Sequence, residues 1–202
     1  MEERQRVGAV TESNEAASDA TRSRILDAAD ALLQRRGVRG MTVAELARRS
    51  GLSRPTIYRY WNDADDVIRA ALLRRVVVIL GHFPRPASSR RELVDDVLRF
   101  ISRFRTDAVY ARLLADEPES FTRYTLQRVG SSQRVILDWL ARAIASAQDD
   151  HSVRRGDPQE ISVMLLLIAQ SAVLSHGTVS ELIDEAGWER ELRAALDGHL
   201  RP

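Results

Sequence analysis

The sequence predicts an all-α fold of about nine helices, in which a three-helix head precedes a larger helical bundle. Long windows place apolar residues three and four positions apart, helix caps recur along the chain, and no stretch shows the sustained alternation of a half-buried strand. The chain has 202 residues, of which 44% are hydrophobic and 29% charged, so it can bury a sizeable core. These observations indicate a globular protein built of packed helices.

The N-terminal stretch, residues 1–20, is polar and lacks an apolar period, so we expect a flexible tail there. The first helix is predicted over about residues 21–36, because the apolar residues from Ile25 to Leu33 fall on one helical face. Gly37 follows directly and is a favourable helix end.

Two short helices follow, predicted over about residues 43–50 and 53–61. At the first, the Thr42 hydroxyl can accept the Glu45 amide while the Glu45 carboxylate returns to the Thr42 amide, which is a capping box. At the second, a serine can cap the helix, and Pro55 occupies the first turn, where a missing N–H costs nothing. This size and spacing are typical of a helix-turn-helix.

A fourth helix is predicted from Asn62 or Asp63 to about residue 80, where one glycine and two prolines break the pattern. A second capping box, from Ser89 to Glu92, starts the next helix, and Asp157 caps a later one. The remaining helices are expected at about residues 108–116, 119–129, 132–148, 158–175 and 181–200.

Several classes of protein are excluded by what the sequence lacks. It contains no cysteine, which excludes disulfides, thiolate nucleophiles, zinc fingers and iron–sulfur ligation. Its histidines show no His-Glu-x-x-His spacing, and neither Gly-x-Ser-x-Gly nor a P-loop occurs, so we expect neither an enzyme nor a bound metal or other cofactor. The longest apolar runs, Val76–Leu80 and Val163–Ala169, are shorter than a bilayer span, and no secretory signal is evident, so we expect a cytoplasmic protein without membrane contact.

Positive charge is concentrated in one segment. All 30 basic residues are arginine, and residues 20–62 hold nine of them against three acidic residues, a net charge of +6. Residues 1–19 carry −3 and residues 63–202 carry −2. A short basic block on a slightly acidic body indicates a nucleic-acid-facing module attached to a scaffold with another task.

The second short helix of this block separates an apolar face from a basic one. Helical spacing places Ile57 and Trp61 toward a core. Tyr60 could face either this core or a DNA phosphate. Arginine reads guanine edges, threonine and proline carbons can contact a thymine methyl, and hydroxyls bind phosphate, so the other face suits a DNA duplex. The residues of this outward face are Arg54, Pro55, Thr56, Tyr58 and Arg59.

Residues 42–61, TVAELARRSGLSRPTIYRYW, resemble the DNA-binding segment of the tetracycline-repressor (TetR) family of bacterial transcription regulators. The similarity extends to RILDAADALLQRRG before this segment and ADDVIRAAL after it. The resemblance implies a dimeric, ligand-responsive transcriptional regulator. More specifically, it implies a repressor that binds a palindromic DNA operator and is released by a small-molecule effector. It also implies three parts: a flexible tail (1–20), a helix-turn-helix DNA-binding domain (21–65) and an effector-binding and dimerisation domain (66–202).

The resemblance implies a role in DNA binding for ten residues. Thr42 would contact phosphate, the start of the recognition helix and Arg59 would face base edges or sugars, and the two tyrosines would hold phosphates. In many relatives a lysine at the start of the fourth helix grips a phosphate, but this chain has Ala64 there, and we expect Arg22 and Arg24 to compensate. The full set is Arg22, Arg24, Thr42, Ser53, Arg54, Pro55, Thr56, Tyr58, Arg59 and Tyr60.

The larger bundle carries two further expectations. The stretch from Ile161 to Leu174 is apolar almost all round, so one side should pack in its own bundle and the other against a partner. The resemblance implies a homodimer through the last two helices, with the interface residues Ile161, Leu165, Ile168, Ala172, Trp188, Leu192 and Leu196. It also implies an effector pocket in the middle helices, with the candidate residues Phe100, Phe104, Tyr110, Phe121, Tyr124, Trp139, Met164 and Gln170.

Alternatives stay open at these positions. Packing alone would explain each aromatic residue, and Gln170 and Ser171 could either line a cavity or satisfy each other across a dimer axis. A helical protein-interaction module whose heads no longer bind DNA is the alternative function.

Overall fold

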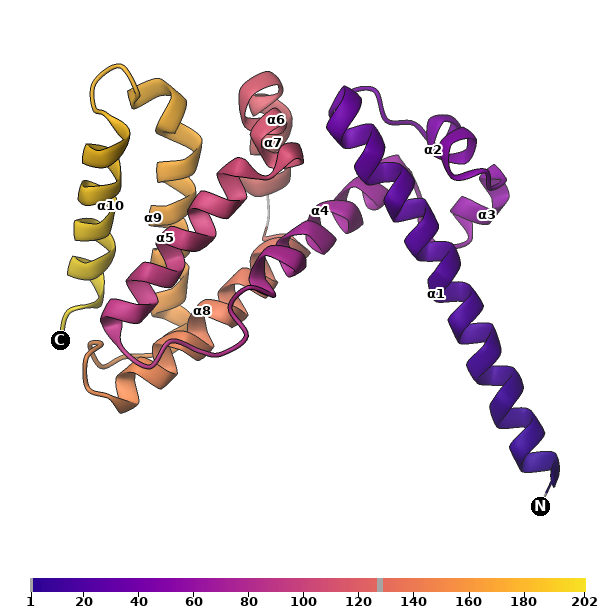
Figure 1. The fold of residues 1–202 in the computed structure, drawn as a ribbon, viewed down its shortest axis with the longest axis horizontal. Helices are drawn as coiled ribbons and strands as arrows, with labels where there is room; N and C mark the ends of the chain where they lie inside the picture. Colours follow the sequence, from indigo (N-terminus) through magenta and orange to yellow (C-terminus); the bar gives the residue numbers. More distant parts are fainter. Residues whose placement is uncertain (1, 127–128) are drawn as a thin grey trace. The chain divides into compact units, whose positions relative to one another are not determined.

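The computed structural model describes residues 2–126 and 129–202, and over these residues the chain forms ten α-helices and no strand (Figure 1). The predicted all-α class is confirmed. The chain divides into two compact units between Ala71 and Leu72, inside helix α4 (Ala64–Leu80). Because α4 continues through this division, one helix joins the two units covalently. The domain boundary expected after residue 65 lies earlier in the same helix.

The N-terminal unit contains α1 (Glu2–Arg36), α2 (Val43–Ser50), α3 (Arg54–Tyr58) and the start of α4. α2 packs against α1, and α3 packs against α2. Each helix contributes buried apolar side chains to one small core: Ile25, Ala29, Leu33, Leu46, Ile57, Val67 and Ile68.

The C-terminal unit contains the rest of α4 and six further helices. They are α5 (Arg90–Thr106), α6 (Ala108–Asp116), α7 (Pro118–Leu126), α8 (Ser131–Asp149), α9 (Pro158–Val179) and α10 (Glu185–Leu200). α8 packs along α9, and α5 contacts α6, α8, α9 and α10, so α5 is central to the bundle (Figure 1). The fully buried side chains of this core include Leu93, Leu113, Ile144, Ile161, Leu165, Leu196 and Leu200.

Two helix ends in the N-terminal unit differ from the prediction. α1 begins at Glu2 rather than near residue 21, because the polar stretch contains no proline and is rich in Glu and Ala, which favour a helix even without an apolar face to bury. α3 ends at Tyr58 rather than near Trp61. The Trp61 amide still donates to the Ile57 carbonyl at 3.1 Å, so the turn continues beyond the helix.

The last two helices also meet at a different place from the one predicted. α9 extends to Val179, and α10 begins at Glu185 after its cap Asp184. Leu182, expected at the start of the final helix, lies between them with 85% of its surface exposed. The helix predicted over residues 119–129 corresponds to α7, and residues 127 and 128 of that prediction lie outside the described residues.

The predicted capping boxes form only in part. Thr42 accepts the Glu45 amide at 3.2 Å, but the Glu45 carboxylate pairs with two arginines instead of the Thr42 amide. At Ser89 the pattern is the same, since the glutamate of that box accepts hydrogen bonds from Ser88. Charged donors form stronger hydrogen bonds with a carboxylate than a neutral amide does, which explains the first difference.

α9 is apolar on more than one side, but the bundle covers only part of it. Its 22 residues are long and apolar enough to cross a membrane by length and composition, which is weak evidence because the core helices of water-soluble proteins pass the same test. Only 17% of its most apolar window is buried. Ile161 and Leu165 face the core, whereas Val163, Met164 and Leu167 are 44%, 45% and 48% exposed. One apolar face of α9 is therefore open.

Leu165→Ala and Leu167→Ala compare two positions on α9 that differ in burial. Removal of the fully buried Leu165 side chain should lower the free energy of unfolding by about 2–5 kcal/mol. Removal of the half-exposed Leu167 side chain should cost less than about 1 kcal/mol at low protein concentration. Urea denaturation followed by circular dichroism measures both values, and equal losses would contradict the orientation of α9.

Candidate functional site

The turn between α2 and α3 requires a glycine. Gly51 ends α2 in the left-handed conformation, with a φ of +67°, and its amide donates to the Ala47 carbonyl. A Cβ at this position would lie 2.8 Å from a terminal nitrogen of the Arg24 guanidinium, so Arg24 packs over the turn. Ser53 then opens α3 by accepting the Thr56 amide at 3.2 Å. The predicted helix-turn-helix is present, and its turn sets the direction of α3.

α3 presents one side to the core and the other to solvent. Ile57 is completely buried, while Tyr58 is 55% exposed. Arg54, Pro55 and Arg59 are exposed as well, and none of residues 54–59 is acidic. The structure therefore places most of the predicted recognition side chains on one exposed basic surface.

Two residues of this segment, Thr56 and Trp61, differ in burial from the prediction. Thr56 is half-buried, with its hydroxyl 2.8 Å from the Ser53 hydroxyl, so it is less available than its outward neighbours. Trp61, predicted to lie in the core, is only half-buried. Thr42, at the start of α2, is exposed as a phosphate ligand needs to be.

Tyr60 lies between two arginines that come from different segments of the N-terminal unit. The Arg59 guanidinium donates to the Tyr60 hydroxyl at 2.7 Å, and Arg22 of α1 lies over the same ring, 5.3 Å from its centroid. Hydrogen bonds with Ser18 and then with Arg59 lower the pKa of Tyr60. We call these four residues, Ser18, Arg22, Arg59 and Tyr60, the Tyr60 corner. It brings together three of the predicted DNA contacts.

Two residues near this basic surface, Ser18 and Glu45, are not among those predicted from the sequence to act there. Ser18 falls in the stretch predicted to be a tail, although its spacing of four from Arg22 would place both on one face of a continuous helix. Glu45 pairs with Arg48 and Arg36, and the hydrogen bond from Arg48 is the largest cause of the lowered pKa of Glu45. One carboxylate therefore partly neutralises both arginines, and the net charge of +6 for residues 20–62 already includes it.

Acidic caps hold the start of α4. Asp63 accepts the Asp66 amide at 2.7 Å, and the Asp66 carboxylate accepts hydrogen bonds from Arg69 and Asn62. The hydrogen bond from Arg69 is the largest cause of the lowered pKa of Asp66. Ala64 contributes no cation here, so this position offers no ligand for a phosphate.

Five residues predicted for an effector pocket lie in one aromatic cluster of the C-terminal unit, together with Phe83, which the sequence analysis did not single out. Phe104 stacks on Tyr110 with ring centroids 3.9 Å apart, and Phe83 meets Trp139 at 5.4 Å. The other neighbouring ring pairs are 5.5 to 6.3 Å apart. The cluster consists of Phe83, Phe100, Phe104, Tyr110, Phe121 and Trp139.

The other predicted pocket residues have different surroundings. Met164 is 45% exposed on the open face of α9 and is not among the residues of the aromatic cluster. Gln170 accepts a hydrogen bond from Gln133 of α8 at 3.2 Å and thereby ties α8 to α9. Tyr124 is half-buried on α7.

Two polar contacts attach α6 to the C-terminal half of α4. The Arg75 guanidinium donates to both Asp107 carboxylate oxygens, at 2.8 and 2.6 Å, and these side chains are only 16% and 17% exposed. Asp107 also caps α6 by accepting the Val109 amide at 3.0 Å. The Tyr110 hydroxyl of the aromatic cluster donates to the Leu72 carbonyl at 2.8 Å. We call the Arg75–Asp107 and Tyr110–Leu72 contacts the α4–α6 latch.

The structure divides the seven residues predicted for a dimer interface. Four are buried within the chain's own bundle, so they are not available to a partner: Ile161, Leu165, Leu192 and Leu196. For Ile161 and Leu165, periodicity alone could not distinguish the inward from the outward face of α9, because both faces are apolar. Three are partly exposed: Ile168, Ala172 and Trp188.

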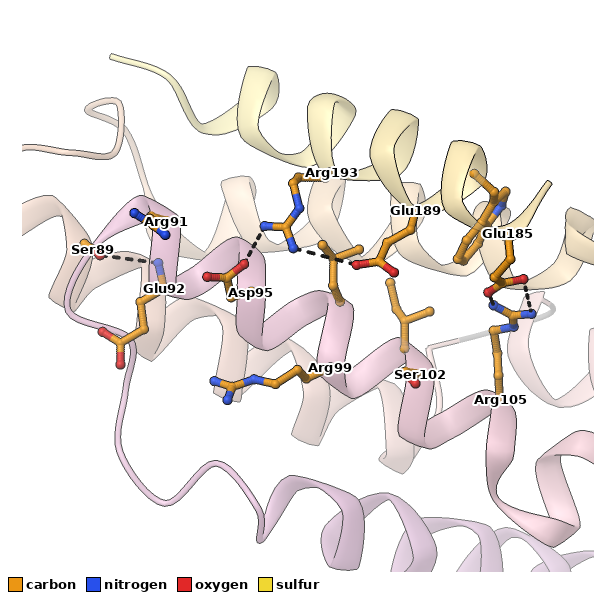
Figure 2. Close-up of a pocket in the computed structure, with 13 residues that line it drawn as sticks. Ser89, Arg91, Glu92, Asp95, Arg99, Ser102, Arg105, Glu185, Glu189 and Arg193 are labelled. Carbon is orange, nitrogen blue, oxygen red and sulfur yellow. Dashed lines mark hydrogen bonds and ion pairs between the residues drawn. The ribbon is translucent and has the colours of Figure 1, made fainter. Parts of the chain in front are cut away.

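A groove of about 560 Å³ lies between α5 and α10 and is crossed by ion pairs (Figure 2). Arg105 pairs with Glu185 at 2.6 Å and lies over the Trp188 ring, and Arg193 pairs with Asp95 further along the groove. Four arginines and four acidic residues line the groove, so their formal charges cancel. None of the predicted pocket residues lines it, and its charges act chiefly to hold α10 against α5.

The geometry of the N-terminal unit defines a helix-turn-helix protein, and comparisons agree with this class. The family of bacterial regulatory proteins of the tetR type matches residues 25–71. The HTH-type transcriptional regulator Mb2274c of Mycobacterium bovis is 36% identical over 180 residues, which cover 89% of this chain and 94% of that protein.

Solved structures of this class share the fold. The transcriptional repressor QsdR of R. erythropolis, from the TetR family, has a TM-score of 0.69 at 18% identity, with 90% of this chain and 95% of that chain covered. RolR in complex with resorcinol has a TM-score of 0.65 at 12% identity, with 92% and 90% covered. The chain belongs to the TetR family and is a transcriptional regulator with a helix-turn-helix DNA-binding domain.

The Arg105–Glu185 pair makes stability sensitive to acid. Hydrogen bonds from Arg105 and then from His176 lower the pKa of Glu185 from 4.5 to about 2. A folded-state pKa below the unfolded value stabilises the folded chain above about pH 4.5, and this contribution is lost as the pH falls toward about 2. Because the Glu185 side chain is 61% exposed, we expect only about 0.5–1 kcal/mol.

Urea denaturation of wild type and Glu185→Gln at several pH values isolates this contribution. The wild type should be more stable than the variant near neutral pH, and the difference should disappear as the pH approaches about 2. A difference that stays constant across this range would contradict the lowered pKa.

Proposed function

We propose that the chain is a homodimeric transcriptional repressor that binds a palindromic DNA operator and releases it when a small-molecule effector binds. The outward face of α3 carries this proposal, because it exposes Arg54, Tyr58 and Arg59 above the buried Ile57. A regulator that acts on bacterial DNA would work in the cytoplasm and would need no enzymatic activity.

On the operator, α3 would enter the major groove. Arg54 and Arg59 would donate to base edges, while Tyr58 and Thr42 would bind the phosphates that fix the register. The Tyr60 corner would add a further phosphate contact. One α3 makes few such contacts and its affinity falls steeply with salt, so two copies related by a two-fold axis would be needed for specific binding.

The open face of α9 is the proposed contact between the two copies. Val163, Met164 and Leu167 expose apolar side chains along it, and contiguous exposed apolar surface marks interaction sites. The partly exposed Ile168 and Ala172 lie on the same helix. Pairing of two such faces would cover the surface that the chain's own bundle leaves open.

The aromatic cluster is the proposed region of effector binding. Its rings offer the apolar surface that small-molecule sites commonly provide, and the Tyr110 and Asp107 side chains link this surface to α4. RolR, a similar structure, is known in complex with resorcinol, which supports a small-molecule effector in this fold.

The α4–α6 latch would transmit the effect of effector binding from the aromatic cluster to α4. A ligand that separates the aromatic rings would shift Tyr110 and α6, and the latch would then tilt α4, which continues into the N-terminal unit. The shift in operator affinity is limited by the difference in effector affinity between the two states, commonly 1–3 kcal/mol.

The alternative, a protein-interaction module with heads that no longer bind DNA, makes an opposite prediction. A DNA-binding head gives a logarithm of affinity that falls linearly with the logarithm of salt concentration, whereas an inactive head gives no binding to titrate. The exposed basic face of α3 favours the DNA-binding function.

Arg54→Ala and Arg59→Ala should each weaken binding to a selected operator by about 1–3 kcal/mol and relax the preference for particular bases. Tyr58→Phe should weaken binding to operator and scrambled duplexes alike, because a phosphate contact carries no sequence information. Fluorescence anisotropy with both duplexes measures the two effects. Equal losses on both duplexes for the arginine variants would show that they contact phosphate rather than bases.

Tyr110→Phe removes only the hydroxyl that reaches the Leu72 carbonyl and keeps the stacked ring. In the absence of effector, we expect weaker operator binding, by about two- to tenfold, because a latch contact that holds α4 in the DNA-binding state is lost. Ser180→Ala, which removes a hydroxyl bond to the Gly177 carbonyl far along the chain, is the matched control. Unchanged operator affinity in Tyr110→Phe would contradict the role of the latch.

A further inference from the structure

Acidic and DNA-binding residues share one face of α1. Glu15, Ser18, Asp19 and Arg22 are spaced at i, i+3, i+4 and i+7, which places them on the same side of the helix. Ser18 and Arg22 both contact Tyr60, as described for the Tyr60 corner. The Asp19 carboxylate therefore lies beside a group proposed to hold a phosphate, and Glu15 lies one turn before it on the same face.

Asp19 already engages one of these groups. Its carboxylate lies 4.0 Å from the Arg22 guanidinium, and the two side chains are 79% and 56% exposed. An exposed pair at this distance is weak, so a DNA phosphate can displace the carboxylate. However, α1 is continuous from Glu2, so the Asp19 carboxylate stays close to Arg22 when DNA approaches.

We propose that Glu15 and Asp19 act as an intramolecular brake on DNA binding, because the Asp19 carboxylate competes with DNA phosphate for Arg22 and Glu15, on the same face of α1, adds negative charge near that guanidinium. The inference rests on the proposed function, since it requires DNA to bind beside α3. Phosphate contacts supply the sequence-independent part of the affinity, so the brake lowers affinity for every duplex by the same factor. Base reading by α3 is unaffected, and binding to non-operator DNA stays weak.

The test uses the full-length Glu15→Gln/Asp19→Asn variant, which removes two charges with little change in shape. Binding to a selected operator and to a scrambled duplex of equal length is measured by fluorescence anisotropy over a range of salt concentrations. At low salt, affinity for both duplexes should rise by about two- to tenfold. The gain should shrink as salt screens the carboxylates.

A matched control removes the same charges elsewhere. Asp149 and Glu181 are exposed residues of the C-terminal unit, so Asp149→Asn/Glu181→Gln changes the net charge equally without touching the α1 face. This control should bind both duplexes as the wild type does. A gain as large as that of the α1 variant would overturn the brake, because the effect would then follow net charge alone.

Repetition of the double substitution in an Arg22→Gln background tests the competition itself. The gain in affinity should vanish there, since no guanidinium remains for the carboxylates to occupy. A gain that persists, or no gain in the original background, would overturn the brake while leaving the proposed function intact. A wild type that binds neither duplex at any salt concentration would overturn the proposed function and the brake with it.

Discussion

Burial of Ile57 decides which side of α3 faces outward, and the DNA-binding surface depends on it. A helix of five residues is not stable alone in water, so α3 exists because its apolar side packs into the N-terminal unit. Burial of one such side chain contributes about 1.5–3 kcal/mol. The left-handed Gly51 and the Ser53 cap fix the approach of the chain, and together these constraints leave Arg54, Tyr58 and Arg59 exposed on one surface.

Charge pairing then decides how much of the basic surface is effective. Arg36 and Arg48 share the Glu45 carboxylate, which the net charge of +6 for residues 20–62 already includes. Arg22 lies near Asp19, which is outside that segment and offsets a further part of the charge. In the C-terminal unit, ion pairs connect helices rather than offset a basic surface. Arg75 and Asp107 connect α4 to the cap of α6, next to the aromatic ring of Tyr110, so polar contacts link the apolar interior to the helix that joins the units.

The features that could be predicted from sequence are those encoded within a few residues. The helix-turn-helix, its glycine turn and its caps depend on local spacing, and the aromatic cluster contains five of the eight residues expected at a pocket. The orientation of α9 could not be predicted, because apolar side chains on both faces give no contrast between core and open surface. The second half of the Thr42 capping box failed for another reason: Arg48, three residues after Glu45, and Arg36 of α1 compete for the same carboxylate, and only the folded chain brings Arg36 to it.

The proposed function requires that two copies of α3 read one symmetric DNA site. Selection of bound sequences from a pool of random duplexes, followed by sedimentation of the protein with the most enriched duplex, tests it directly. We expect a palindrome whose half-sites lie about one helical turn of DNA, or a multiple of it, apart, with two chains on each duplex. A pool without enrichment, or a single chain bound to an asymmetric site, would contradict it.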